Sequence, residues 1–183
     1  MRRPILIAAA ALLLVASPVG AEEKPWEADL RPSYVILGSD RPTGGPALWG
    51  EGKRRWTLSD TVTATGGAQF GVVGVGGPGN WLGVLGGPVG SVSVRPWTPD
   101  VRLTLGLALD FGRLPTCKHI AGLAEGETLC LGYVGLFPAL SGGVDFYSEG
   151  HVAAGASCSL RYINTLGWTG ASVEPSAFAR VFW

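Results

Sequence analysis

A strict alternation of apolar and polar residues in Val101–Gly112 constrains the fold of this chain more than any other feature. Its six odd-numbered residues are Val, Leu or Phe, and the residues between them are Arg102, Thr104, Gly106, Ala108, Asp110 and Gly112. Successive side chains of a β-strand point to opposite faces, so this segment predicts a strand with one apolar and one polar face. In a helix the same apolar residues would lie all around the cylinder, and the pattern therefore favours a β-fold.

The same period of two recurs along the chain. Gly90–Arg95 alternates as well, and the turn residues Pro96–Asp100 that follow it predict a tight antiparallel hairpin with the strand described above. Gly143–Tyr162 keeps one phase for about twenty residues, with its apolar face interrupted by Ser148 and Gly150, and we interpret it as a single strand. Weaker alternation is present in Leu30–Leu37, Leu48–Leu58, Val62–Val73, Leu82–Val89, Leu129–Phe137 and Val173–Trp183.

With Leu82–Val89 and Gly90–Arg95 taken as one strand, these segments predict eight strands. The assignment is weakest in Glu51–Arg55, where charges fall on both faces and a loop or turn is an alternative. Short connections alternate with longer ones, as in an up-and-down arrangement. About 20 residues per strand and connection leave room for strands of about 9–11 residues, the length that crosses a membrane. The predicted connections are Gly38–Ala47, Ser59–Asp60, Gly74–Trp81, Pro96–Pro99, Arg113–Glu127, Pro138–Gly142 and Ile163–Trp168.

The first 21 residues have the pattern of a cleavable secretory signal. Arg2 and Arg3 give the segment a positive start, Ile5–Ala16 is apolar, and small residues follow where a signal peptidase needs them. Twelve apolar residues reach only about 18 Å as a helix, whereas a bilayer core is about 30 Å thick. We expect cleavage after Ala21, which leaves residues 22–183 as one β-barrel domain.

Formal charge is balanced, with 14 lysine plus arginine residues and 14 aspartate plus glutamate residues. The chain therefore has no basic field of the kind that holds nucleic acid, and nucleic-acid binding is excluded. The 34-residue segment Thr61–Val94 carries no charge, but it contains eleven glycines together with Pro78 and Pro88. These residues make a spanning helix costly in this segment, whereas spanning strands tolerate them better.

Alternation alone leaves open which face of each strand meets solvent. The polar faces hold mainly Gly, Ala, Ser and Thr, and the whole chain has only three lysines, whereas soluble surfaces are usually rich in lysine and glutamate. We therefore predict an all-β fold, an eight-stranded antiparallel up-and-down transmembrane β-barrel, with apolar faces toward lipid and polar faces filling the interior. Its predicted interior charges are Arg95, Arg102, Asp110, Asp145, Glu149, Arg161, Glu174 and Arg180.

The tryptophans lie near the ends of the predicted strands, and none falls in the middle of one. In membrane barrels, tryptophan and tyrosine gather in girdles at the two membrane–water interfaces. This placement predicts two such girdles. The predicted interface aromatics are Trp49, Trp56, Trp81, Trp97, Trp168 and Trp183.

The end of the chain, Ala177–Trp183, has a terminal aromatic residue preceded by apolar residues at every second position. This segment resembles the C-terminal strand of bacterial outer-membrane β-barrels, although that strand commonly ends in Phe where this one ends in Trp. With the export signal and the eight predicted strands, residues 22–183 resemble the small eight-stranded members of that class. The resemblance implies a location in the Gram-negative outer membrane and recognition of the last strand by the outer-membrane assembly machinery.

Three cysteines are expected to meet an oxidising compartment after export. Cys117 and Cys130 flank the longest predicted connection, and we predict a disulfide bond between them worth about 3 kcal/mol, while Cys158 remains a small apolar side chain. Cys117, His119 and Cys130 lack a fourth ligand nearby, so we predict no metal site. Gly74–Gly79 matches the dinucleotide pattern GxGxxG, but no helix follows it, and we predict no cofactor.

One pair of residues suggests catalysis. Glu149 and His151 share the polar face of the predicted strand Gly143–Tyr162, about 6–7 Å apart along it, and are weak candidates for an orienting acid and a base. The resemblance implies that some barrels of this kind are lipid acylhydrolases or acyltransferases. An isolated histidine beside a glutamate more often makes only structural hydrogen bonds.

We therefore expect a non-enzymatic structural or interaction role in the envelope, such as the barrel component of a larger assembly. The expected partners are membrane lipids, the assembly machinery and other envelope proteins. A lipid-modifying outer-membrane enzyme and a soluble exported barrel that binds an apolar ligand inside are the two alternatives.

Overall fold

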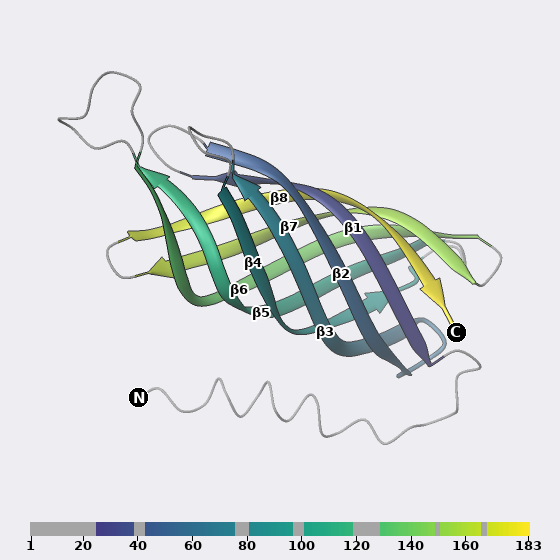
Figure 1. The fold of residues 1–183 in the computed structure, drawn as a ribbon. Helices are drawn as coiled ribbons and strands as arrows, with labels where there is room; N and C mark the ends of the chain where they lie inside the picture. The colour runs from purple at the N-terminus through teal and green to yellow at the C-terminus, as the bar shows by residue number, and fades with distance from the viewer. Residues whose placement is uncertain are drawn as a thin grey trace, which may run out of the picture.

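The structure, a computed structural model, describes residues 25–38, 43–75, 81–96, 101–118, 129–148, 151–165 and 168–183. Each strand pairs antiparallel with the next, and β8 pairs with β1, so the sheet closes into a barrel (Figure 1). Within these residues no helix is long and apolar enough to cross a membrane. The strands are β1 Trp26–Leu37, β2 Thr43–Thr57, β3 Val62–Val75, β4 Trp81–Val94, β5 Val101–Lys118, β6 Leu129–Ser148, β7 Val152–Thr165 and β8 Trp168–Phe182.

The barrel has two ends, which we name from the chain. β1 begins and β8 ends at the terminal rim, where the backbones of Trp26 and Trp183 exchange two hydrogen bonds of 3.1 Å. The opposite end, the loop rim, carries the connection between β5 and β6, residues 119–128, the longest between consecutive strands. Figure 1 shows the strands running obliquely between the two rims. The chain therefore enters and leaves the barrel at the same end.

The predicted alternation in β5 is confirmed. Leu105, Leu107 and Phe111 are exposed on the outside, whereas Arg102 and Asp110 are fully buried inside. On this strand, apolar side chains therefore cover the outer wall and charged side chains point into the interior. This arrangement is the opposite of the one that a soluble barrel with an apolar ligand inside would require.

Glu51–Arg55 is a regular part of β2 rather than a loop or turn. Glu51, Lys53 and Arg55 are buried inside, and Arg54 is exposed outside. Three of the four charged residues therefore share the inner face. The segment was ambiguous in the sequence because Arg54 alone breaks the alternation of its charges.

Several predicted strand boundaries in the second half of the chain are wrong. Pro138–Gly142 is not a connection but lies within β6, which pairs with β5 without a break from Leu129 to Phe146. Pro138 is tolerated because the pairing of β6 with β7 begins only at Ala139, so no ladder bond to β7 is needed from the proline. Gly143–Tyr162 is not one strand but is divided by a turn between Ser148 and Val152.

The remaining differences lengthen strands, at the terminal rim for β1, which begins at Trp26 instead of the predicted Leu30, and otherwise at the loop rim. β2 begins at Thr43 and β5 continues to Lys118, inside segments predicted as connections. β7 runs to Thr165 and β8 begins at Trp168, which leaves two residues between them. Backbone pairing continues in these places because the neighbouring strand offers partners even where the side-chain alternation is weak.

The seam between β1 and β8 has an interrupted ladder. Because Trp26 and Trp183 form a hydrogen-bonded pair, every second residue from each of them directs its backbone N–H and C=O across the seam. Pro32 on β1 and Pro175 on β8 both occupy such positions, and proline has no N–H to donate. The register is unchanged on both sides of the gap, so two backbone hydrogen bonds are missing from an otherwise regular seam.

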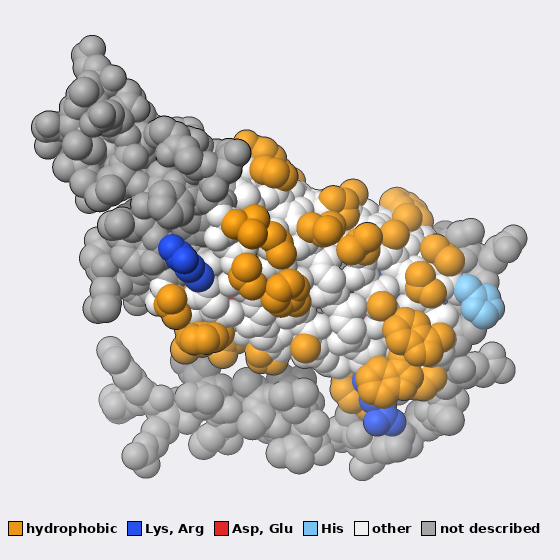
Figure 2. All heavy atoms as spheres, viewed as in Figure 1, with side chains coloured by type: hydrophobic (Ala, Val, Ile, Leu, Met, Phe, Trp, Pro, Cys, Tyr) orange, Lys and Arg blue, Asp and Glu red, His pale blue; other side chains and the backbone are white. Residues whose placement is uncertain are grey.

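An apolar belt covers the outside of the barrel. Figure 2 shows hydrophobic side chains spread over the wall, with basic side chains only toward the two ends of the visible face. Among the strand side chains that the structure describes, Arg54 and Arg113 are the exposed charged ones. The largest exposed fractions, 64–66%, belong to Leu82, Leu107 and Val134.

Candidate functional site

The interior divides into an apolar part and a charged part. The apolar part lies toward the loop rim and fills that half of the barrel with closely packed side chains. The charged part extends from the middle of the barrel to the terminal rim. The apolar cluster consists of Val35, Leu37, Ala47, Trp49, Val73, Leu85, Leu114, Phe137 and Ile163.

Among the residues that the structure describes, the charged part is electrically balanced, with six acidic and six basic side chains. Removing a single ion from water is expensive, and nearby opposite charges with good hydrogen bonds reduce that cost. The balance explains how so many charges are accommodated within one narrow barrel. The acids are Glu27, Asp29, Glu51, Asp110, Asp145 and Glu174, and the bases are Arg31, Lys53, Arg55, Arg102, Arg161 and Arg180.

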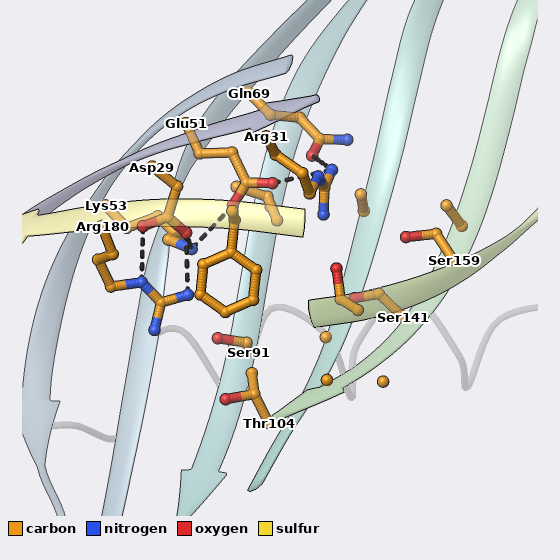
Figure 3. Close-up of a pocket in the computed structure, with 18 of the residues that line it drawn as sticks. Asp29, Arg31, Glu51, Lys53, Gln69, Ser91, Thr104, Ser141, Ser159 and Arg180 are labelled. Atoms are coloured by element: carbon orange, nitrogen blue, oxygen red, sulfur yellow. Dashed lines mark hydrogen bonds and ion pairs between the residues drawn. The ribbon is translucent and has the colours of Figure 1, made fainter. Parts of the chain in front are cut away.

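Near the terminal rim, two bases converge on Asp29. The Arg180 guanidinium donates from Nε to Oδ1 of Asp29 at 2.6 Å and from Nη2 to Oδ2 at 2.9 Å, and its Nη1 reaches Asp145 at 2.9 Å. Lys53 Nζ donates to Asp29 at 2.7 Å and to Glu51 at 2.8 Å (Figure 3). These contacts join β1, β2, β6 and β8 through buried side chains.

A second group of polar contacts lies in the middle of the barrel around Asp110. Arg161 donates to Asp110 Oδ2 from Nε at 3.2 Å and from Nη2 at 2.9 Å, and it also pairs with Glu174. Gln69 donates to Asp110 at 2.7 Å and accepts from Arg31 at 3.4 Å. The network thereby connects strands on opposite sides of the barrel.

Trp49 lies inside the barrel and not at a membrane interface, contrary to the prediction. Its side chain is fully buried, with the guanidinium groups of Arg161 and Arg31 at 4.4 Å and 5.8 Å from its ring. The ring covers Gly71, the residue opposite on β3, where an added Cβ would lie only 2.2 Å from a ring atom. Trp49 is therefore the member of the apolar cluster whose ring contacts arginines of the charged network.

The other predicted interface aromatics have different outcomes. Trp183 is exposed at the terminal rim and Trp56 is half-buried near the same rim. The side chains of Trp81, Trp97 and Trp168 lie outside the described residues. Trp26, opposite Trp183, is also exposed, so the terminal rim carries outward-facing tryptophans.

The structure places six of the eight predicted interior charges in buried positions: Arg102, Asp110, Asp145, Arg161, Glu174 and Arg180. Arg95 is half-buried just beyond the end of β4, and Glu149 lies outside the described residues. Sequence reasoning missed the interior charges of β1 and β2. The sequence does contain a signal for them, because charged residues recur at every second position in both strands. They are Glu27, Asp29 and Arg31 in β1 and Glu51, Lys53 and Arg55 in β2. Those three positions of each strand share one face.

A cavity of about 50 Å³ remains in the charged part of the interior. Charged side chains, including Asp29, Glu51 and Arg180, line one side, and hydroxyl groups, including Thr104 and Ser159, line the other (Figure 3). A water molecule needs a cavity of about 10–15 Å³ on this scale, so a few waters fit and an organic substrate does not. The cavity therefore has room for water that would hydrate the network.

The predicted catalytic pair is not assembled on one strand face. His151 lies exposed in the turn before β7, and its carbonyl accepts a hydrogen bond from the backbone N–H of Phe182 at 2.9 Å. Glu149 lies outside the described residues. The prediction of a shared polar face is wrong because the strand that was to carry both residues is interrupted between them and Val152. The described residues contain no group of three or more His, Cys, Asp or Glu side chains that would hold a metal ion.

Cys117 and Cys130 lie directly opposite each other in the register of β5 and β6. Their side chains lie outside the described residues, so the disulfide remains a prediction. Cys158 is a free cysteine, exposed on the outer wall of β7. It faces the same side as the apolar residues of that strand.

Comparison with solved structures places this architecture among known barrels. The structure is similar to Neisserial surface protein A, with a TM-score of 0.56 and 14% sequence identity over 87% of this chain and 97% of that chain. It is also similar to Ail, the attachment invasion locus protein of Yersinia pestis, with a TM-score of 0.53 and 13% identity over 88% of this chain and 99% of that chain. No protein-family model and no curated protein matches the sequence.

The closed antiparallel topology, the charged interior and these similarities define the fold class. The chain has the fold of the small eight-stranded outer-membrane β-barrels. At sequence identities this low, the structural similarities establish the architecture alone. The role of this particular chain has to be argued from its own residues.

Proposed function

We propose that the protein is an integral outer-membrane β-barrel with a non-enzymatic structural or interaction role. The observation that carries the proposal is the inverted distribution of side chains. Six acids and six bases of the described strands are enclosed, whereas large hydrophobic side chains such as Leu105, Leu107 and Phe111 are exposed. A soluble protein would rarely expose so large a continuous apolar surface.

The strands are long enough for this role. The shortest, β1, has 12 residues, and the longest, β6, has 20, while a tilted membrane strand needs about 9–11. The excess in β5 and β6 extends their hairpin beyond the paired part of β7 at the loop rim. We assign the loop rim to the cell exterior, because outer-membrane barrels have longer loops outside and short turns toward the periplasm.

The filled interior argues against a diffusion pore. An eight-stranded barrel is just wide enough for side chains to fill, and here apolar packing occupies one half while ion pairs occupy the other. Function is then left to the loops, the outer wall and bound partners. The similarity to a protein named for attachment and invasion supports interaction at the cell surface as the class of role.

The proposal includes export and assembly. The signal segment would be cleaved after Ala21, and the assembly machinery would recognise the last strand, which presents Ala179, Val181 and Trp183 on its outer face. Other envelope proteins remain candidate partners. The sequence of the mature N-terminus, read from the purified membrane protein, tests the cleavage site.

The deciding experiment is to follow the protein through fractionation and heating. Full-length protein expressed in a Gram-negative host is expected in the outer-membrane fraction, with a change in gel mobility when it is boiled in dodecyl sulfate. Recovery in the aqueous fraction without detergent, with no change in mobility, would overturn the proposal. Turnover of membrane lipids by the purified protein, abolished by His151→Ala, would instead establish the enzymatic alternative.

A further inference from the structure

Arg54 is an unusual residue in the outer wall. It is exposed on β2 near the terminal rim, in a wall where Arg113 is the other exposed charged side chain of the described strands. Its guanidinium lies 5.9 Å from the centre of the Trp26 ring, on the neighbouring strand. Within the described part of the chain no carboxylate pairs with Arg54. A positive charge is thus held against an aromatic ring at the edge of the apolar belt.

Beside Arg54, the outward-facing residues of β2 and its neighbouring strands are small. On the side of Arg54 away from Trp26, the opposite residue is Gly66 on β3, which has no side chain. The next outward position of β2 is Gly52, where an added Cβ would meet no atom within 4 Å. Its neighbours across the two adjacent strands are Ala28 and Ala68. These small residues therefore form the floor of a shallow groove on the outer wall, and the groove begins at Arg54.

This floor continues toward the middle of the membrane as a groove. At Gly50 the neighbouring strands carry Leu30 and Phe70, which are 55% and 56% exposed and form its two sides. Leu48, 50% exposed, closes the groove further along β2. From Arg54 to Leu48 is six residues, about 20 Å along a strand, and a strand tilt of about 40° converts this to about 15 Å of depth. That depth is half of a hydrocarbon core of about 30 Å, the thickness of one leaflet.

We infer that Arg54, Trp26 and the groove along β2 form a binding site for one anionic phospholipid in the leaflet at the terminal rim. The phosphate would accept hydrogen bonds from the Arg54 guanidinium, the headgroup would lie beside Trp26, and an acyl chain would occupy the groove over Gly52 and Gly50. The inference rests on the proposed membrane location. Charge complementarity selects the ligand, because basic residues at a membrane surface attract anionic lipid.

The test uses full-length protein reconstituted in bilayers that contain equal amounts of phosphatidylglycerol and phosphatidylcholine. Lipids that remain bound after transfer to detergent are counted by native mass spectrometry. The wild type is expected to retain phosphatidylglycerol about fivefold over phosphatidylcholine, the ratio that one basic residue near a membrane surface supports. Arg54→Gln is expected to bring the ratio close to one.

Two matched controls separate the site from general effects. Arg113→Gln removes the other exposed arginine, whose strand neighbours Val84 and Val134 carry no ring, and should leave the ratio unchanged. Gly52→Leu fills the groove without changing charge and should reduce retention, whereas Gly142→Leu, at an equally open outward glycine of β6, should not.

The outcomes distinguish this inference from the proposed function. Normal insertion with no preference for phosphatidylglycerol, or equal loss in the Arg54 and Arg113 variants, would overturn the lipid site and leave the membrane location intact. Failure of the wild type to enter any bilayer would overturn the proposed function and the lipid site together.

Discussion

Arg180 and Asp29 face each other across the seam that closes the barrel, joined by two parallel hydrogen bonds of 2.6 and 2.9 Å. The same guanidinium reaches Asp145 on β6, and the same carboxylate accepts a hydrogen bond from Lys53 on β2. The pair therefore stands where the first and last strands meet and where backbone hydrogen bonds are fewer than in a regular ladder. Its side chains are buried, so water screens the interaction weakly.

Removal of one partner of this pair should be costly. Arg180→Gln leaves Asp29 and Asp145 with less compensation inside the barrel, and we expect the free energy of unfolding to fall by about 3–5 kcal/mol. Urea unfolding in detergent micelles measures the change. Arg54→Gln, an exposed site, should stay within about 0.5 kcal/mol of the wild type.

The double variant Asp29→Asn with Arg180→Gln tests whether the two side chains interact directly. Because the two side chains interact directly, its loss should be smaller than the sum of the two single losses. Simple additivity of the single losses would contradict a direct interaction across the seam.

Trp49 and Gly71 define a second prediction. Gly71→Val should destabilise the barrel, because an added Cβ would lie 2.2 Å from the Trp49 ring and the ring cannot move without disturbing the packed apolar cluster. Overpacking of this kind costs about 1–3 kcal/mol. Gly52→Val adds the same side chain over open space and is the control, with the mobility change on heating as the measurement. Because valine has a higher β-propensity than glycine, equal losses in both variants would show that the ring contact does not set the effect.

The depth of the apolar belt can be measured with one type of substitution. Leu107 and Leu82 are exposed to similar extents, 66% and 64%, but Leu107 lies in the middle of the wall and Leu82 at the loop rim. Leu107→Arg should cost about 2–4 kcal/mol in a bilayer and Leu82→Arg about 0–1 kcal/mol. Folding into lipid vesicles, followed by urea titration, provides both values. Equal costs would mean that the outer wall contacts water rather than lipid.

Cys117 and Cys130 should form a disulfide bond in protein isolated from the envelope, because the register places them opposite each other on adjacent strands. Opposite residues in antiparallel strands have Cα atoms about 4.5–5.5 Å apart, within the range that a disulfide spans. Intact-mass measurement with and without reductant should show the loss of two hydrogen atoms, and one thiol, Cys158, should react with a maleimide. Three reactive thiols in the unfolded, unreduced protein would contradict the pairing.

The sequence predicted the architecture well where one residue type dominates each face of a strand. In β5 the leucines lie outside and Arg102 and Asp110 inside, because alternation leaves a single phase that buries the charges. The phase was also right on both sides of the turn between β6 and β7, although the turn itself was missed. The two strands continue the same alternation across it, and the sign of the break is that Ser148 and Gly150 occupy positions where the apolar face expects large side chains.

Other features of the interior depended on contacts that no local pattern contains. Trp49 resembled an interface residue because the start of β2 was placed too late, at Leu48 instead of Thr43. Its actual place depends on a glycine from β3 and on arginines from β1 and β7. The ion pairs of Asp29 likewise join strands from both ends of the chain, and their partners are fixed only when the barrel closes.

The prolines at the β1–β8 seam have a kinetic consequence. Asp29 and Arg180 are 151 residues apart in the sequence, so the contact between them is among the last that chain diffusion can form. With Pro32 and Pro175 removing backbone donors, the final step relies on buried charges that β2 and β6 must already have positioned. We therefore expect side chains in the lumen, together with the remaining backbone pairs of the seam, to influence the rate at which the open sheet becomes a barrel, and single substitutions there to change that rate without altering any strand.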